Sequence, residues 1–156
     1  YTLTDNISST AYGIVIERDN IILDGAGYTI KGTREYYGIF LESRHNITIK
    51  NARIEAFYYG VYLNHSDNNA ICGNNITNNG YGIRFYYSSN NTIYRNNITN
   101  YAGVLLGHSS NNAIYGNNIA NNDYGVYLDY SSDNMFYHNN FINNTKQAYI
   151  DPAYYL

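Results

Sequence analysis

"GIRFYYSSNNTIYRNNITNYAG", residues 82–103, begins and ends on a glycine, and each of these glycines opens an apolar-x-apolar triplet. The pattern recurs with spacings of 22, 22, 21 and 22 residues at Gly38, Gly60, Gly82, Gly103 and Gly125. An earlier copy, "GIVI", starts at Gly13. A fixed period of about 20–50 residues is typical of a repeat architecture, in which each unit buries its apolar face by stacking on its neighbours. The chain is therefore predicted to consist of stacked units of about 22 residues.

Each unit contains three short apolar segments. Aligned on the glycines, they form three files: Leu41, Leu63, Phe85, Leu106, Leu128 and Ile150; Ile49, Ile71, Ile93, Ile114 and Phe136; and Ile54, Ile76, Ile98, Ile119 and Phe141. None is long enough for a helix of about ten residues, and turn residues separate them. Three short strands and three bends are typical of one rung of a parallel β-helix, whose strands pair with those of the next rung about 4.8 Å away. Because parallel crossovers are predominantly right-handed, we predict one all-β domain over residues 1–156, a right-handed single-stranded parallel β-helix of six to seven rungs.

Asparagine is unusually frequent, with 27 of 156 residues. Pairs recur at the same bend of successive units: Asn74/Asn75, Asn96/Asn97, Asn117/Asn118 and Asn139/Asn140 in one bend, and Asn68/Asn69, Asn90/Asn91, Asn111/Asn112 and Asp133/Asn134 in another. Asn tolerates left-handed backbone angles, and its amide can bond to the same amide one rung away. We therefore predict asparagine ladders at the bends.

Composition excludes several classes of protein. A net charge of −3 with only 13% charged residues offers no basic footprint for nucleic acid. No apolar run approaches the roughly 20 residues of a membrane span, and Cys72 is the single cysteine, which excludes an internal disulfide. Seven N-x-S/T sequons, candidate glycosylation sites, lie at Asn6, Asn46, Asn64, Asn75, Asn90, Asn97 and Asn143. We expect an extracellular or cell-surface protein; because the chain begins at Tyr1, we expect a processed protein or a fragment of a longer surface protein.

Four phrases carry a family resemblance: "NIILDGAGYTIKG" (20–32), "NITIKNARI" (46–54), "NNTIYRNNITN" (90–100) and "YHNNFINNTKQAY" (137–149). They resemble the NosD-like right-handed β-helix repeat proteins of archaeal and bacterial cell surfaces. The resemblance covers almost the whole chain and implies the fold. The repeat also occurs in carbohydrate-binding proteins and sugar hydrolases, and the family takes its name from a periplasmic protein linked to copper-site maturation.

Carboxylates and histidines are the candidates for chemistry. Asp129 and Asp151 share one column on adjacent rungs, as do Glu17 and Glu42, a spacing compatible with a glycosidase pair. The sequence places no further catalytic type of side chain beside either pair, so we favour solvated carboxylates and predict no catalytic residue. His65 and His108 share a turn column but are two rungs, about 10 Å, apart. We therefore predict no metal site and no cofactor.

Two tyrosine sets form the predicted interaction stripes. Tyr62, Tyr127 and Tyr149 share a column with Arg84 and Leu105, whereas Tyr94, Tyr115 and Tyr137 form an unbroken run on another strand. Each lies beside an inward apolar residue, so strand alternation points it outward. Such stripes can serve three purposes: ring stacking that only stabilises the sheet, contact with another protein, or glycan binding.

Neither end of the predicted stack carries an evident cap. We expect end contacts from Tyr1, Leu3, Tyr154, Tyr155 and Leu156, with copies of the chain stacked head to tail. A domain cut from a longer protein is the competing explanation. The predicted function is a non-enzymatic structural or adhesive β-helix, with itself, glycans or other surface proteins as partners. The alternative is a carbohydrate-binding or polysaccharide-cleaving module of the same fold.

Overall fold

A computed structural model describes residues 1–151 and contains strands in three parallel sheets. The first, here called the long-strand sheet, contains β2 (Ile14–Ile16), β5 (Tyr37–Glu42), β8 (Tyr59–Asn64), β11 (Tyr81–Tyr86), β14 (Ala102–Gly107), β17 (Tyr124–Asp129) and β20 (Lys146–Ile150). The second, the Tyr94 sheet, contains β3 (Ile22–Asp24), β6 (Thr48–Lys50), β9 (Ala70–Cys72), β12 (Thr92–Tyr94), β15 (Ala113–Tyr115) and β18 (Met135–Tyr137). The third, the Ile98 sheet, contains β1 (Ile7–Ser8), β4 (Thr29–Lys31), β7 (Arg53–Glu55), β10 (Asn75–Thr77), β13 (Asn97–Thr99), β16 (Asn118–Ala120) and β19 (Asn140–Ile142).

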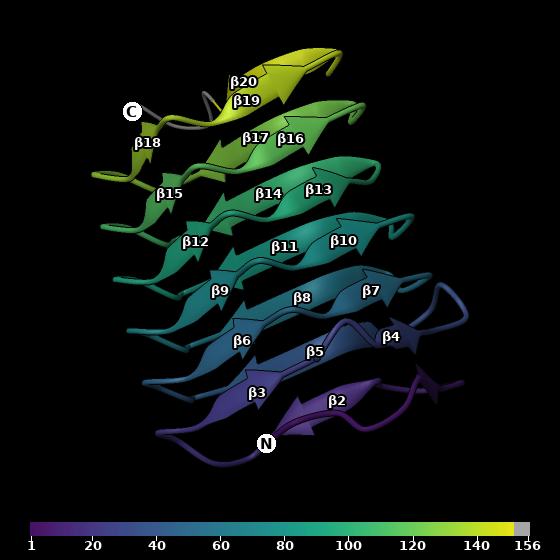
Figure 1. The fold of residues 1–156 in the computed structure, drawn as a ribbon. Helices are drawn as coiled ribbons and strands as arrows, with labels where there is room; N and C mark the ends of the chain where they lie inside the picture. The colour runs from purple at the N-terminus through teal and green to yellow at the C-terminus, as the bar shows by residue number, and fades with distance from the viewer. Residues whose placement is uncertain (152–156) are drawn as a thin grey trace.

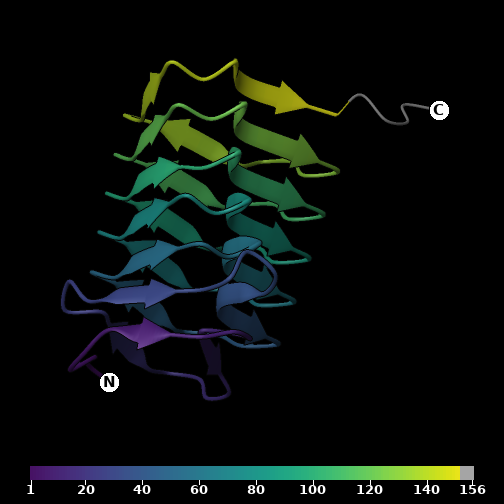
Figure 2. The same ribbon diagram turned by 90° about the vertical axis from the view of Figure 1, so that its right-hand side faces the viewer.

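The chain visits the three sheets in turn and climbs one rung per circuit. In Figure 1 the two sheets of short strands face the viewer and the long-strand sheet lies behind them, with the N-terminus at the bottom. Near strands run rightwards and far strands run back as the chain climbs, which is a right-handed path. Figure 2 shows the rungs from the side, stacked from the N-terminal to the C-terminal end. The predicted right-handed parallel β-helix is confirmed.

The three predicted apolar files form the core. Phe85 pairs with Leu63 and Leu106 in the adjacent rungs. Ile93 pairs with Ile71 and Ile114, and Ile98 pairs with Ile76 and Ile119 in the same in-register manner. All of these side chains are fully buried. Each rung therefore stacks like residues on like residues, and burial of apolar surface between rungs drives the stacking.

The repeated glycine is required by close approach of successive rungs. A Cβ on Gly82 would lie 2.5 Å from the carbonyl oxygen of Gly103 in the next rung and 2.7 Å from the Nδ2 of Asn100. A Cβ on Gly103 would meet the carbonyl oxygen of Gly125 in the same way, at 2.5 Å. A glycine therefore recurs once per rung because a side chain has no room at this point of the backbone.

Buried asparagine ladders close the bends, as predicted. Asn74 donates to the Oδ1 of Asn96 at 3.1 Å, and Asn96 donates to the Oδ1 of Asn117 at 3.0 Å. The predicted ladder through Asn69, Asn91, Asn112 and Asn134 is also present; in it the Oδ1 atoms of Asn91, Asn112 and Asn134 each accept the backbone N–H of the Asn one rung earlier. No buried side-chain nitrogen or oxygen among the described residues lacks a hydrogen-bond partner.

The asparagine columns differ from the sequence prediction in two respects. In the bend before Asn96 the left-handed backbone belongs to the preceding residue, Arg95, with φ of 56°, and the outer Asn97 begins strand β13 instead. A further ladder, not predicted from the sequence, runs through Asn79, Asn100, Asn122 and Asn144. Its signal is an Asn three residues after Ile76, Ile119 and Phe141 of the third apolar file, and two residues after Ile98.

Candidate functional site

The outer side of the long-strand sheet is covered by two adjacent columns of mostly aromatic residues. One column is Phe40, Tyr62, Arg84, Leu105, Tyr127 and Tyr149, which strand alternation turns away from the core. The other is Tyr37, Tyr59, Tyr81, Ala102 and Tyr124, each directly before a repeat glycine. With Tyr12, Tyr36, Tyr58 and Tyr101 at the bends before these strands, the two columns make up what we call the aromatic face.

The rings of the aromatic face contact one another in two blocks. In the lower block Tyr59 lies 5.3 Å from Tyr37, 5.1 Å from Tyr62 and 5.2 Å from Tyr81, measured between ring centroids. In the upper block Tyr127 lies 5.1 Å from Tyr149 and 5.7 Å from Tyr124. Strand β14 separates the blocks, because Ala102 and Leu105 stand where the other rungs have larger side chains.

Five phenol hydroxyls of the aromatic face have a raised pKa. Burial raises the pKa of Tyr59 to about 12, and burial also raises the pKa of Tyr37, Tyr62 and Tyr81. The pKa of Tyr127 rises to about 12 chiefly because its hydroxyl donates a 2.7 Å hydrogen bond to the Oδ2 of Asp151. The face therefore presents neutral phenols that can donate hydrogen bonds to a ligand.

Arg84 is the charged residue at the centre of this face. Its Cζ lies 5.3 Å from the centroid of the Tyr86 ring, within the range of a cation–π contact. A Cβ on Gly107, in the next rung, would lie only 2.7 Å from its Nη2, so the guanidinium rests against bare backbone there. No carboxylate among residues 1–151 forms an ion pair with Arg84.

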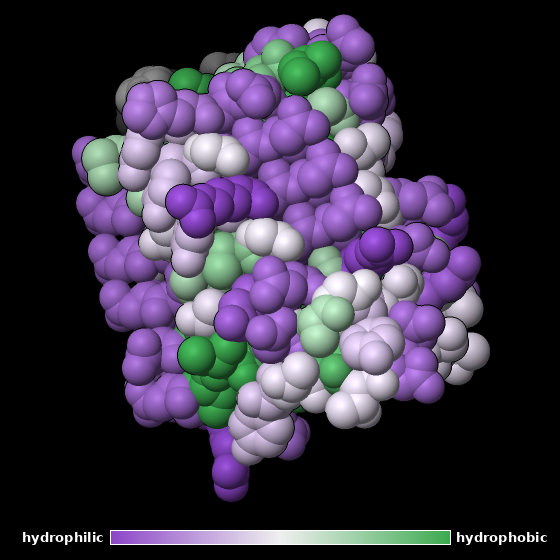
Figure 3. Space-filling model, viewed as in Figure 1, coloured by the Kyte–Doolittle hydropathy of each residue, from purple (hydrophilic) through white to green (hydrophobic). Residues whose placement is uncertain are grey.

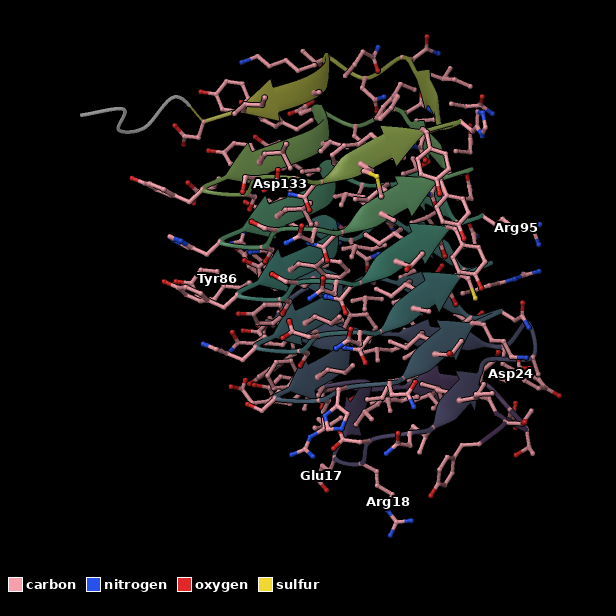
Figure 4. All side chains as sticks on the ribbon, turned by 90° about the vertical axis from the view of Figure 1, so that its left-hand side faces the viewer. Glu17, Arg18, Asp24, Tyr86, Arg95 and Asp133 are labelled. Atoms are coloured by element: carbon pink, nitrogen blue, oxygen red, sulfur yellow. The ribbon has the colours of Figure 1, made fainter. Side chains whose placement is uncertain are left out.

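The second predicted stripe lies on a different surface. Tyr94, Tyr115 and Tyr137 stack on the Tyr94 sheet with centroids 5.2 Å and 4.9 Å apart and ring planes within 8° of parallel. Figure 4 shows Tyr86 and Arg95 at opposite edges of the molecule, one beside the aromatic face and the other beside this stack. The structure therefore divides the six predicted tyrosines into two surfaces, three on each.

A third aromatic array stands at the bend after the long-strand sheet. The rings of His65, Tyr87, His108 and Tyr130 stack with centroids 5.1, 4.6 and 5.0 Å apart. As expected from the sequence, Tyr87 separates the two histidines. Among the described residues no group of three or more His, Cys, Asp or Glu side chains could hold a metal ion.

The carboxylate candidates lie along one edge of the long-strand sheet. Glu17 and Glu42 follow the paired residues Ile16 and Leu41. Glu42 accepts two hydrogen bonds, of 3.1 and 2.9 Å, from the Nδ2 of Asn64. Figure 4 shows Glu17 beside Arg18 at the N-terminal end, pointing away from the stack.

The other pair lies near the C-terminal end of the same column. Asp129 and Asp151 follow Leu128 and Ile150, which pair in adjacent rungs. The hydrogen bond from Tyr127 engages Asp151. The absence of a catalytic residue stays a prediction for both pairs.

The sequons stay predictions as well. Asn6, Asn46, Asn90, Asn97 and Asn143 are exposed, whereas Asn64 and Asn75 are half-buried. Asn97 also donates to the Oδ1 of Asn75 at 2.8 Å, which links two of the sequons along the outer side of the Ile98 sheet.

The N-terminal end of the stack is hollow and apolar. A hollow of about 450 Å³ is lined by Tyr1, Leu3, Ile14, Ile16, Ile21 and Leu23, among others. Figure 3 shows hydrophobic residues gathered at this lower end, below a largely hydrophilic face. Of the predicted end contacts, Tyr1 and Leu3 line this hollow, and their contact with another copy stays a prediction. Tyr154, Tyr155 and Leu156 lie outside the described residues. No helix of the described chain is long and apolar enough to cross a membrane.

Comparison with known proteins gives one family and two similar folds. The family model described as "Periplasmic copper-binding protein (NosD)" matches residues 2–154. An alginate lyase from Paenibacillus sp. str. FPU-7 is similar over 88% of this chain and 76% of its own, with 14% identity and a TM-score of 0.53. The enzymatically active domain of bacteriophage CBA120 tailspike protein 2 is similar over 85% of this chain and 26% of its own, with 14% identity and a TM-score of 0.55. No match was found among curated sequences. At this identity the likeness to the solved structures is one of fold.

The family's description names copper, but the described residues 1–151 contain no set of side chains arranged to bind a copper ion. Cys72 is buried and pairs with Lys50 and Tyr94 in the adjacent rungs, so no second thiolate or imidazole adjoins it in its column. His65 and His108 stack on opposite sides of the Tyr87 ring and cannot share one ion.

Proposed function

This chain belongs to the NosD family of β-helix proteins, and from that premise we propose that it is a non-enzymatic protein of the cell envelope or exterior that binds an extended saccharide polymer along its aromatic face. The observation that carries the proposal is the continuity of the face, whose rings contact one another from Tyr12 to Tyr101 in the lower block. A periplasmic family description supports the location.

Phenol rings suit a sugar ligand for two reasons. Their faces provide apolar contact area for the C–H groups of a pyranose ring, and their hydroxyls bond to sugar hydroxyls. A tyrosine hydroxyl is already protonated at physiological pH and can donate a hydrogen bond, and the raised pKa values of Tyr37, Tyr59 and Tyr62 extend that range further into alkali. A stack of near-identical rungs about 4.8 Å apart also offers the same contact repeatedly, which suits a polymer with a repeating unit. The similar alginate lyase acts on a polysaccharide, which supports this class of ligand.

The state of the carboxylates supports binding over cleavage. A glycosidase pair needs one free nucleophile or base and one acid on opposite sides of a bond. Glu42 is held by two hydrogen bonds from Asn64, and Asp151 accepts one from Tyr127. Both lie on the edge of the sheet, and Asp151 is engaged by the hydroxyl of Tyr127.

The test is retention on a panel of immobilised acidic and neutral polysaccharides, with analysis of the released material. We expect at least one polymer to be bound and no polymer to be shortened. Tyr62→Ala should weaken binding by about 3- to 10-fold, the loss of one stacking contact. Tyr115→Ala, a matched change on the Tyr94 sheet, should leave binding unchanged. Release of oligosaccharides would overturn the non-enzymatic assignment, and retention of proteins but of no polysaccharide would favour a protein partner.

A second candidate function, end-to-end assembly, is supported by the hollow at the N-terminal end. Val15 and Ile22 are 45% and 53% exposed at the lower rungs, and Met135 and Ile150 are 59% and 69% exposed at the upper ones. A second copy stacked in register would cover apolar residues at both ends, and an open head-to-tail contact produces filaments. Sedimentation velocity over a range of concentrations tests this: association that Leu3→Glu abolishes is the expected result, and a monomer at all concentrations would overturn it.

A further inference from the structure

We propose that Arg84 makes the aromatic face selective for acidic saccharides, by binding the carboxylate of a uronic acid unit with its guanidinium. This inference rests on the proposed function and names its ligand class. It follows from the position of Arg84, from its free hydrogen-bonding capacity and from the absence of other charged side chains on the aromatic face in the rungs directly before and after it.

Position is the first argument. Arg84 lies in the outer column of β11, between Tyr62 of β8 and Leu105 of β14. Its positive charge also acts on Tyr59 and Tyr81 of the second column, whose pKa values it lowers against the larger effect of burial. The guanidinium is therefore set among the rings, where a polymer lying on the face would pass over it.

Free hydrogen-bonding capacity is the second argument. A guanidinium has five N–H donors in a planar fork, and a carboxylate accepts two of them at once. None of the five is bonded to a residue within 1–151, and the described ion pairs of the protein involve Lys31, Arg44, His45 and Lys50 instead. The cation–π contact with Tyr86 orients the group without using a donor.

Local charge is the third argument. The column beside Arg84 carries Glu42 on β5 and Asp129 on β17, but Asn64, Tyr86 and Gly107 on the three strands between them. Arg84 is therefore the charged residue in the central rungs of the face, and its strand lies two rungs, or about 10 Å of backbone spacing, from the nearest strand that carries a carboxylate in this column. Bare Gly107 also leaves room for the guanidinium to lie flat where a side chain would displace it. The centre of the face thus complements one negative charge.

The experiment compares ligands that differ only in that charge. Binding of the full chain to alginate and to polygalacturonate is measured by affinity electrophoresis and calorimetry, each against the esterified form of the same polymer. The wild-type protein should prefer the free acid, and added salt should reduce the preference. Arg84→Gln should weaken binding of the free acid by about 10- to 100-fold and leave binding of the ester unchanged.

Two variants separate the guanidinium from charge in general. Arg84→Lys keeps the charge but loses the planar fork, so it should recover only part of the preference. Arg95→Gln removes one positive charge from an exposed position near the Tyr94 stack and should not change the preference. Equal thermal midpoints of the variants would establish that each is folded.

The outcomes separate the two proposals. If neither the acids nor the esters bind, the proposed function fails. If acid and ester bind equally and Arg84→Gln changes nothing, the saccharide site stands and this inference is overturned. A sulfated glucan, which is anionic but has no carboxylate, would overturn the choice of carboxylate if it bound as tightly as the uronates with the same dependence on Arg84.

Discussion

The Nδ2 of Asn96 donates a hydrogen bond of 3.0 Å to the Oδ1 of Asn117 one rung further on, and the Asn96 side chain is only 2% exposed. The same nitrogen also donates to the carbonyl oxygens of Ile71 and Tyr94, at 2.9 and 3.1 Å. The Oδ1 of Asn96 accepts from the backbone and side-chain nitrogens of Asn74. One buried carboxamide therefore ties three rungs together and satisfies backbone groups that the bend leaves free of the sheets.

We expect Asn96→Leu to lower the free energy of unfolding by about 3–5 kcal/mol, because several buried donors and acceptors lose their partner at once. Asn97→Ala, at the exposed neighbouring position, should cost less than about 1 kcal/mol. Chemical denaturation followed by circular dichroism measures both. Equal stability of the two variants would contradict a structural role for the inner column.

Gly82→Ala should destabilise the protein by about 1–3 kcal/mol, because the new methyl group would press on the carbonyl oxygen of Gly103. Gly116 offers a control, because a side chain has room there. It has a φ of +64°, a Cβ added there would meet no atom within 4 Å, and Arg95 and His138 adopt the same left-handed backbone at the equivalent bend. Gly116→Asn should therefore change stability by less than about 0.5 kcal/mol. A Gly82→Ala protein that melts with the wild type would contradict the close-packing explanation.

The fold was predictable because stacked rungs require the same kind of residue at the same place about every 22 residues. Gly82, Phe85, Ile93 and Ile98 each recur in register, and the structure pairs each file as the alignment does. The backbone of the bends was harder to predict. Arg95 has the left-handed conformation although Asn is the residue that favours it, because the bend fixes the backbone there and the inner Asn96 is needed for its amide.

The candidate site was predicted only in part. Tyr62, Tyr127 and Tyr149 were identified by strand alternation, but Tyr37, Tyr59 and Tyr81 were missed. Each lies two residues before an inward apolar residue, Ile39, Val61 or Ile83, so simple alternation would assign it to the inner side. The Tyr-Gly dipeptide, at residues 12–13, 37–38, 59–60, 81–82 and 124–125, was the available signal. The free state of Arg84 could not be predicted, because it depends on which side chains of other rungs reach it.

Tyr115→Ala should lower the free energy of unfolding by about 1–3 kcal/mol, because the Tyr115 ring stacks on both Tyr94 and Tyr137. Tyr115→Phe keeps the ring and should cost less than about 0.5 kcal/mol. Thermal and chemical denaturation measure the pair. If the alanine variant is as stable as the phenylalanine variant, stacking does not stabilise the Tyr94 sheet, and an interaction role for this stripe is favoured instead.

Stability should fall as the pH rises from about 10 to about 12, because Tyr59 and Tyr127 have pKa values of about 12 in the folded protein against 10.0 for an ordinary tyrosine. In this range the unfolded chain has already lost protons that the folded protein still holds, so raising the pH favours unfolding; below pH 10 both states hold them and the contribution is constant. Thermal midpoints at pH 8 to 12, together with absorbance of tyrosinate, measure the effect.

Tyr59→Phe should flatten the dependence of stability on pH, because phenylalanine has no proton to lose. Asp151→Asn should lower the pKa of Tyr127 towards 10, because the hydrogen bond from the Tyr127 hydroxyl would no longer have a charged acceptor. Tyr59 should still have a pKa of about 12. A thermal midpoint that does not change between pH 10 and 12 would contradict the burial of Tyr59 in the aromatic face.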